Sequence, residues 1–272
     1  MADAIDTNAN RDAAGSVDSS QPRLRDTWLL HKAQLLQLLV AYGVLTGVGA
    51  GLGKLLTGPL EDSAIVTRDV EIAEDLAANR TPRGDDVSHV ASMLADTGVK
   101  IVATAIIALI MLAVWKRWRD PLMMVVPLVL EASAFITITV LVGRPRPQVE
   151  RLESSPVDSS FPSGHVAAAA CYTALAIVIA WRTRHRWIPV VVAIVLLVLP
   201  VAVGWGRMYR GMHFLSDVVA GFVLGIVAVV VSWLILRAAP EGPLHLRRGG
   251  DNDKSQGQHQ HQAQHQAQLQ QQ

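Results

Sequence analysis

Three short stretches of this chain hold the residue types that bind and transfer phosphate. A phosphate monoester carries nearly two negative charges, and its transfer needs neutralisation of charge more than covalent help. Two arginines, two histidines and one carboxylate therefore suit transfer of a phosphoryl group to histidine and then to water, without a metal. The three stretches are Arg144-Pro145-Arg146-Pro147, Pro162-Ser163-Gly164-His165, and Arg207 followed by His213 and Asp217.

The arginines and the glycine-containing stretch predict an anion site. Arg144 and Arg207 each present a planar fork of donors that matches phosphate oxygens. Ser163 can cap a helix that starts there, Gly164 lets a ligand approach the backbone, and free N–H groups at a helix start attract anions. An ordinary helix start has the same composition, and it is His165 at the anion site that favours the functional interpretation.

The pair His213 and Asp217 predicts an oriented nucleophile. Residues four apart on a helix share a face. The carboxylate can accept one imidazole N–H, which fixes the tautomer and leaves the other nitrogen free to attack phosphorus. A structural His–Asp pair is the alternative for an isolated pair, so the argument depends on the three stretches together.

The composition predicts membrane-spanning elements that position these residues. Hydrophobic residues make up 51% of the 272 residues, in runs that approach the length of about 20 residues needed to cross a bilayer. We expect an all-α integral membrane bundle of six transmembrane helices, in one domain over 33–237. Segments 1–32 and 238–272 are expected to be disordered, the second because it is Gln/His-rich. The expected spans are 33–56, 98–115, 121–143, 164–181, 188–205 and 214–236.

The placement of Lys and Arg predicts the orientation. Basic residues gather before the first span, after the last, and in the loops 116–120 and 182–187, and such segments remain in the cytoplasm. Both termini of this multi-pass protein are therefore expected in the cytoplasm, and the chain in the cell membrane. The acidic loop 57–97 then faces outside and is expected to contain an amphipathic helix. All three stretches fall at the outer membrane–water interface.

Other features narrow the possible functions. No basic patch is interleaved with aromatic residues, so nucleic-acid binding is not expected. The single cysteine, Cys171, lies in an apolar run and is expected to be an inert buried thiol. Small residues at Gly43, Gly47 and Gly51 are expected to pack within the bundle, with dimerisation as the alternative.

In order and spacing, the three stretches resemble the type 2 phosphatidic acid phosphatase superfamily, which has a haloperoxidase-like helical core. The resemblance covers about 35–237. It implies that His213 is the nucleophile that forms a phosphohistidine and that Asp217 orients it. It implies that His165 protonates the leaving oxygen and later activates water, with no metal and no cofactor. The residues implied to hold the phosphate are Arg144, Ser163, Gly164 and Arg207.

Two positions depart from the family pattern. The lysine that precedes Arg-Pro in the family falls at Thr137, and the serine that precedes Arg207 is Gly206. Loss of the lysine cation should weaken phosphate binding or relax the choice of phosphate. The cations predicted at the outer helix ends that could compensate are Arg146, Arg210 and Lys100.

The expected function is hydrolysis of a lipid phosphate monoester or diphosphate, phosphatidic acid-like or polyprenyl, with the lipid substrate and bilayer lipids as partners. A phosphotransferase would use the same phosphohistidine with another acceptor. A non-catalytic lipid-binding or transport protein is the alternative from another class. The sequence leaves the oligomeric state open.

Overall fold

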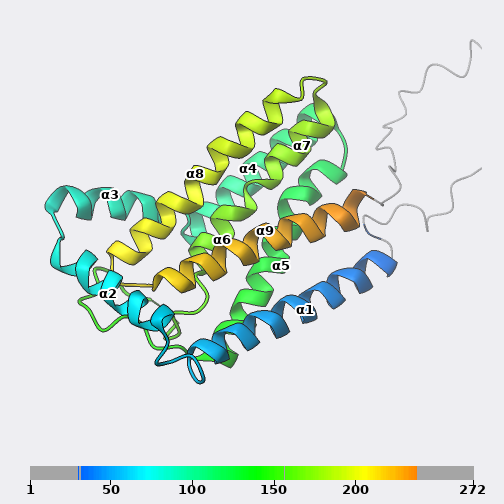
Figure 1. The fold of residues 1–272 in the computed structure, drawn as a ribbon. Coiled ribbons are helices and arrows are strands. Elements are labelled where there is room, and N and C mark those ends of the chain that lie inside the picture. Colours follow the sequence, from blue (N-terminus) through cyan, green and yellow to red (C-terminus); the bar gives the residue numbers. More distant parts are fainter. Residues whose placement is uncertain (1–29, 31, 156, 238–272) are drawn as a thin grey trace, which may run out of the picture.

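The computed structural model describes residues 30, 32–155 and 157–237, and these residues fold into nine α-helices without strands (Figure 1). The two segments expected to be disordered lie outside the described residues, apart from residues 30 and 32. The helices are α1 (Lys32–Leu56), α2 (Ala64–Ala78), α3 (Pro82–Met93), α4 (Thr97–Trp115), α5 (Arg119–Val142), α6 (Gly164–Cys171), α7 (Ala174–Arg182), α8 (Trp187–Tyr209) and α9 (Leu215–Arg237).

Six helical segments of the described chain are long and apolar enough to cross a membrane. They are α1, α4, α5, α8, α9 and the continuous stretch Gly164–Arg182, which joins α6 and α7. The all-α fold with six spans is therefore confirmed. The fifth span extends further than predicted, to Tyr209, so Arg207 lies in the last turn of α8 and not in the following loop.

The short helix α6 forms the centre of the bundle. Its residues from Val166 to Cys171 are almost fully buried, and it packs between α8 and α9. Two glycines of α9 allow this approach, because a Cβ at Gly221 would collide with the Ser163 carbonyl and one at Gly225 with the Ala167 carbonyl. The start of α6 is thereby held against the start of α9, where the Ser163 N–H donates to the Asp217 carbonyl at 3.0 Å.

The glycines of α1 pack differently from the prediction. A Cβ added at Gly43, Gly47 or Gly51 would meet no atom within 4 Å among the described residues beyond its own helix, so the expectation that they pack within the bundle is wrong. Gly49 and Gly53 are the glycines that contact α5, at Ile138 and Val142. Helix α1 therefore turns a different face toward α5 from the one predicted, because Gly49 and Gly53 leave room for the branched side chains of Ile138 and Val142.

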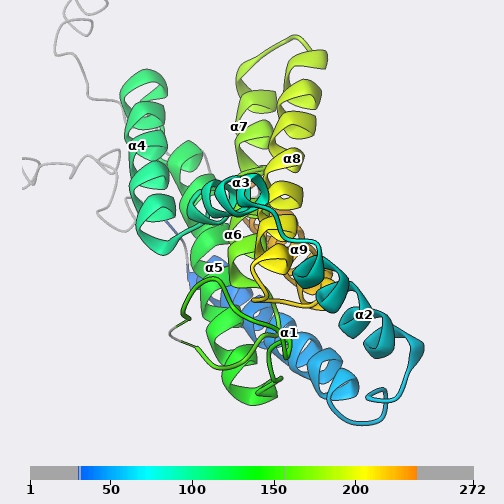
Figure 2. The same cartoon turned by 90° about the vertical axis from the view of Figure 1, so that its left-hand side faces the viewer.

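The loop 57–97 contains two helices where one was expected. Figures 1 and 2 show α2 and α3 at one end of the bundle, with α3 between α4 and α8. Thr81 caps α3 by accepting a hydrogen bond from the Gly84 N–H at 3.1 Å, and Pro82 opens the helix. The Thr81 N–H donates to the Tyr209 hydroxyl at 2.7 Å, which ties α3 to the end of α8.

Candidate functional site

The predicted site residues lie at the same end of the bundle. Arg144 follows α5, Ser163 and Gly164 begin α6, and Arg207 ends α8. His213 and Asp217 lie at the start of α9. Except for His165, whose side chain is 27% exposed, these side chains are buried. Helix ends from four spans therefore place the predicted residues around one region, as expected from the sequence.

His213 is oriented by a backbone carbonyl. Its Nδ1 lies 2.6 Å from the Ser160 carbonyl oxygen, which can only accept a hydrogen bond, so Nδ1 carries the hydrogen and Nε2 carries the lone pair. The Asp217 Oδ2 atom lies 3.9 Å from Nδ1 and accepts a hydrogen bond from the Phe214 N–H at 2.8 Å. The tautomer that we expected Asp217 to fix is thus fixed by Ser160, with Asp217 as a nearby charge.

His213 is neutral at neutral pH. Its burial lowers its pKa well below the ordinary value, and the positive charges of Arg207 and Arg146 lower that pKa further. The hydrogen bond to Ser160 opposes this shift but is the smaller influence. A neutral imidazole with a free Nε2 lone pair is the form that can act as a nucleophile.

Arg144 is held between two carboxylates. Its guanidinium donates to Asp217 Oδ1 at 2.6 Å and to Asp69 Oδ2 at 2.9 Å, and it lies 4.4 Å from the centre of the Phe214 ring. Asp69 comes from α2 and also accepts hydrogen bonds from the backbone and hydroxyl of Ser216. These contacts suit Arg144 to holding Asp217 in place, and its predicted contact with phosphate stays a prediction.

Several buried donors have no hydrogen-bond partner within the described residues, and three of them belong to residues near His213: Arg146 Nε, Arg207 Nε and Ser163 Oγ. They come from the loop after α5, the end of α8 and the start of α6. Arg146 interacts electrostatically with both Arg207 and His213. A buried donor without a partner is costly, so these atoms mark a place where an oxyanion would be stabilised.

The terminal guanidinium nitrogens of Arg146 and Arg207, on the side away from Nε, donate hydrogen bonds within the protein. Arg146 donates to the Met212 carbonyl at 2.5 Å and to the Ser159 carbonyl at 3.1 Å. Arg207 NH1 donates to Ser92 Oγ at 2.9 Å and to the Glu153 carboxylate. Since guanidinium is planar and rigid, these contacts fix the direction of each free Nε–H.

Of the cations proposed to compensate for the missing lysine, Arg146 is placed best. Arg210 is engaged elsewhere, because its Nε donates to Glu153 at 3.0 Å and its NH2 to the Leu152 carbonyl at 2.9 Å. Lys100 interacts electrostatically with His165. Burial, and then the charge of Arg151, lower the pKa of Arg146, which is the response of a cation held out of water.

Comparison with known proteins relates part of this chain to a known family. Residues 121–241 match the model of the PAP2 superfamily. This matched segment contains all three of the stretches singled out in the sequence. The chain is 29% identical over 180 residues to phosphatidylglycerophosphatase B of Bacillus subtilis (strain 168), covering 64% of this chain and 85% of the relative. It is 34% identical over 88 residues to bacitracin transport permease protein BcrC of Bacillus licheniformis, covering 32% of this chain and 39% of that relative.

A solved structure shares the fold. It is that of the first transmembrane PAP2 type phosphatidylglycerolphosphate phosphatase from Bacillus subtilis, with a TM-score of 0.59 and 23% identity, over 76% of this chain and 98% of the other. The match of residues 121–241 to the PAP2 superfamily model confirms the family recognised from the three stretches. It also confirms the expected enzyme class, a membrane lipid phosphatase.

The PAP2 pattern can be aligned with this chain in two ways, because Arg-Pro occurs twice in succession. Alignment on Arg146 moves the lysine position from Thr137 to Thr139. Thr139 is buried and donates to the Phe161 carbonyl at 3.5 Å, whereas Thr137 shares a hydrogen bond with Tyr42 at 2.8 Å. Arg146 was expected only as a compensating cation, and the repeated Arg-Pro is the signal in the sequence that marks it as a candidate for the phosphate site.

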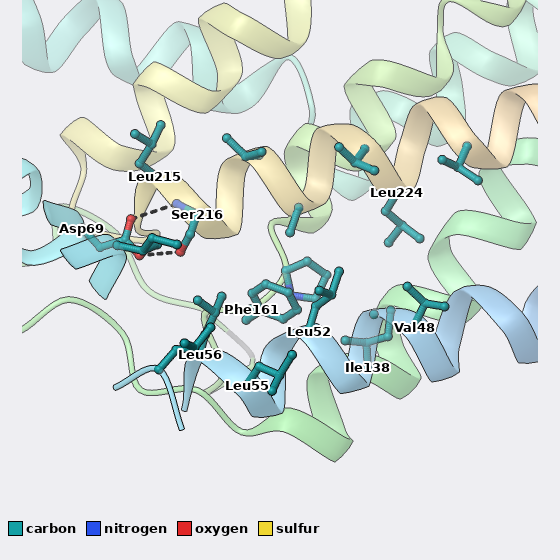
Figure 3. A pocket seen from close by; sticks show the side chains of 18 of the residues that line it. Val48, Leu52, Leu55, Leu56, Asp69, Ile138, Phe161, Leu215, Ser216 and Leu224 are labelled. Atoms are coloured by element: carbon teal, nitrogen blue, oxygen red, sulfur yellow. Dashed lines mark hydrogen bonds between the residues drawn. The ribbon is translucent and has the colours of Figure 1, made fainter. Parts of the chain in front are cut away.

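An apolar cavity of about 910 Å³ lies between α1 and α9, beside the candidate site. Figure 3 shows Val48 and Leu52 of α1 facing the cavity, with Ile138 and Phe161 behind them. Asp69 and Ser216, joined by hydrogen bonds, lie at its polar end. The lining suits hydrocarbon chains, as expected for a protein that works on lipids.

Proposed function

We propose that this protein hydrolyses a lipid phosphate through a phosphohistidine formed on His213, without a metal ion. One observation supports the proposal most directly. The neutral imidazole has its Nε2 lone pair available, and Arg146 and Arg207, each with an unpartnered Nε, interact electrostatically with it. Ser163, whose Oγ is also unpartnered, is joined through its N–H to the Asp217 carbonyl. These groups supply a nucleophile and a cationic cradle for the transferred phosphoryl group.

The first step transfers the phosphoryl group to the protein. His213 Nε2 attacks phosphorus and forms the P–N bond while the P–O bond to the lipid breaks. The leaving oxygen takes the electron pair of that bond and a proton from His165, so the lipid departs as an alcohol or, from a diphosphate, as the lipid monophosphate. Arg146, Arg207 and Ser163 donate to the phosphoryl oxygens, together with Arg144 if substrate binding frees it and with the Gly164 N–H at the start of α6.

The second step regenerates the protein. Water attacks phosphorus and gives its proton to His165, the P–N bond breaks, and inorganic phosphate leaves His213 with its lone pair restored. Asp217 lies 3.9 Å from Nδ1 and stabilises the positive charge that His213 carries while it is phosphorylated. A phosphotransferase would differ only in the acceptor that takes the place of water.

The substrate that we favour is a glycerophospholipid with a terminal phosphate, such as phosphatidylglycerophosphate. The similarity to phosphatidylglycerophosphatase B of Bacillus subtilis supports this choice, and the apolar cavity beside the site has room for acyl chains. A polyprenyl diphosphate belongs in the same assay, because the cavity lining does not distinguish acyl from prenyl chains.

The site is proposed to face the outside of the cell membrane, with both termini in the cytoplasm. The loop between α4 and α5 and the loop between α7 and α8 lie at the end of the bundle opposite to His213. They contain Lys116 and Arg117 in the first case and Arg184 and Arg186 in the second. Short loops with this charge remain in the cytoplasm.

Release of inorganic phosphate from purified protein in EDTA tests the proposal. Substrates are phosphatidylglycerophosphate, phosphatidic acid and a polyprenyl diphosphate, and His213→Ala is the matched variant. We expect release by the wild type, with a loss of at least about 10³-fold in the variant. Equal release by both would reject His213 as the nucleophile. Lipid product without inorganic phosphate would indicate the phosphotransferase, and inactivity of both would indicate a non-catalytic lipid-binding or transport protein.

A further inference from the structure

Four polar residues at intervals of four line one side of the site, and all precede the segment matched by the family model. The four residues lie in α3, in the link that follows it, and in the first turn of α4. Figure 2 shows α3 next to α8. Ser88 contacts Arg210, Ser92 contacts Arg207, and Asp96 contacts His165. The fourth, Lys100, interacts electrostatically with His165.

Ser92 accepts a hydrogen bond from the terminal guanidinium nitrogen NH1 of Arg207. It is 2% exposed, and its hydroxyl oxygen lies 2.9 Å from Arg207 NH1 and 3.3 Å from Glu153 Oε1. The hydroxyl can accept from the arginine and donate to the carboxylate at the same time. The plane of the guanidinium is thereby set, and its unpartnered Nε is left for a ligand.

The approach of α3 depends on the glycine before Arg207. A Cβ at Gly206 would lie 3.0 Å from the Ser88 carbonyl oxygen and 3.2 Å from the Ala91 Cβ. These distances are tighter than ordinary carbon contacts. Without a side chain at Gly206, α3 lies close enough to α8 for Ser92 to reach Arg207.

Asp96 holds the second histidine. Its Oδ1 atom lies 3.1 Å from His165 Nε2, and it is the residue that immediately precedes α4. Nearby elements supply the charged or titratable groups that interact with His165, and these are Asp96, Lys100, Arg146 and His213. Of these, only Asp96 is a carboxylate. It can therefore stabilise the imidazolium that must donate a proton.

We propose that Ser92 and Asp96 are positioning residues for the phosphatase reaction, Ser92 for Arg207 and Asp96 for His165. The inference rests on the proposed function. Because the two residues act through different partners, they serve different parts of the reaction. Ser92 serves the phosphate site, which every substrate uses. Asp96 serves protonation of the leaving oxygen, which matters only when that oxygen is a poor leaving group.

Two substrates separate these effects. The lipid phosphate has an alkoxide leaving group that needs a proton, whereas p-nitrophenyl phosphate has a leaving group that does not. For Ser92→Ala we expect kcat/KM to fall roughly 3- to 10-fold with both substrates, the equivalent of one hydrogen bond, and inhibition by inorganic phosphate to weaken similarly. For Asp96→Asn we expect kcat/KM to fall roughly 10-fold or more with the lipid phosphate and to change little with p-nitrophenyl phosphate.

Matched controls complete the test. Asp86→Asn removes one negative charge from an exposed position of α3 and should leave both activities unchanged, while Asp96→Glu should recover part of the lost lipid phosphatase activity. Thermal unfolding of each variant identifies a loss of fold. Unchanged kinetics of folded Ser92→Ala, or equal losses with both substrates in folded Asp96→Asn, would overturn the inference. A wild type that releases no phosphate would instead overturn the proposed function.

Discussion

At the scale of single residues, two arginines that are neighbours in the sequence have different partners. Arg144 is neutralised by Asp69 and Asp217, which leaves it little capacity for a third anion. Arg146 donates only to neutral acceptors in the described residues and retains a buried, unpartnered Nε. A phosphate dianion gains more from the second arginine because, within the described residues, no carboxylate accepts a hydrogen bond from it.

Replacement of Arg144 and replacement of Arg146 should therefore change the kinetics and the stability in different ways. Arg146→Lys removes the planar fork from the phosphate site, and we expect kcat/KM to fall roughly 10²-fold, mainly through KM. Arg144→Lys loosens Asp217 and Asp69, and we expect a lower melting temperature and a lower kcat with little change in KM. Steady-state kinetics and thermal unfolding in detergent measure both. The reverse pattern would show that Arg144 is the main phosphate ligand.

The pH dependence of the reaction follows from His213. Burial and the charges of Arg207 and Arg146 hold its pKa well below the ordinary value. The attacking neutral form therefore persists as the pH falls, so the acid limb of kcat/KM should lie below pH 6.5, the ordinary histidine value. The basic limb should report loss of the proton that His165 donates, which makes the profile bell-shaped. An acid limb above pH 6.5, or a flat profile, would contradict the assignment.

The same shift predicts a trend in stability. Below pH 6.5 the unfolded chain protonates His213 while the folded protein does not, so the free energy of unfolding should decrease as the pH falls and should be constant above that range. His213→Gln should reduce this dependence. Chemical denaturation in detergent at several pH values measures it, and an unchanged slope in the variant would contradict the assignment.

At the scale of elements, the packing of α6 on α9 places the nucleophile beside the anion site. Gly221 and Gly225 are the contact points, and each lies against a backbone carbonyl of the α6 segment, which cannot move aside as a side chain can. We expect Gly225→Ala to cost about 1–3 kcal/mol of stability through overpacking. Gly43→Ala is the matched control, since α1 has space there. Equal melting temperatures for the two variants would contradict this packing.

The spans were predictable because each apolar run ends in charged or turn residues, and the predicted and observed limits of α1, α5 and α9 differ by two residues or fewer. The face of α1 that packs on α5 was not predictable, because the sequence does not distinguish Gly43 from Gly49. Only the packing of Ile138 against Gly49 does so. The site was predictable where a stretch was contiguous, as at His165. Asp69 and Ser160 were missed, because only tertiary packing brings them to Arg144 and His213.

At the scale of the whole molecule, the spans place every proposed catalytic group at one end and the basic loops at the other. This separation lets cysteine labelling test the orientation, and Cys171 is buried and should not react. In Cys171→Ala protein, we expect a membrane-impermeant maleimide to label Asp62→Cys in intact cells and to label Arg184→Cys only after lysis. Both positions are exposed. Labelling of Arg184→Cys in intact cells would place the site in the cytoplasm.

If phosphate passes through His213, the phosphorylated protein can be trapped during turnover. Purified protein is mixed with substrate in EDTA, quenched at alkaline pH where phosphohistidine survives, and mapped by peptide mass spectrometry. The variant His165→Asn, which cannot activate water, should accumulate the intermediate when p-nitrophenyl phosphate is the donor. We expect one added phosphoryl group on the peptide that contains His213, and none in His213→Ala. Turnover without a phosphorylated His213, or phosphate on another residue, would contradict it.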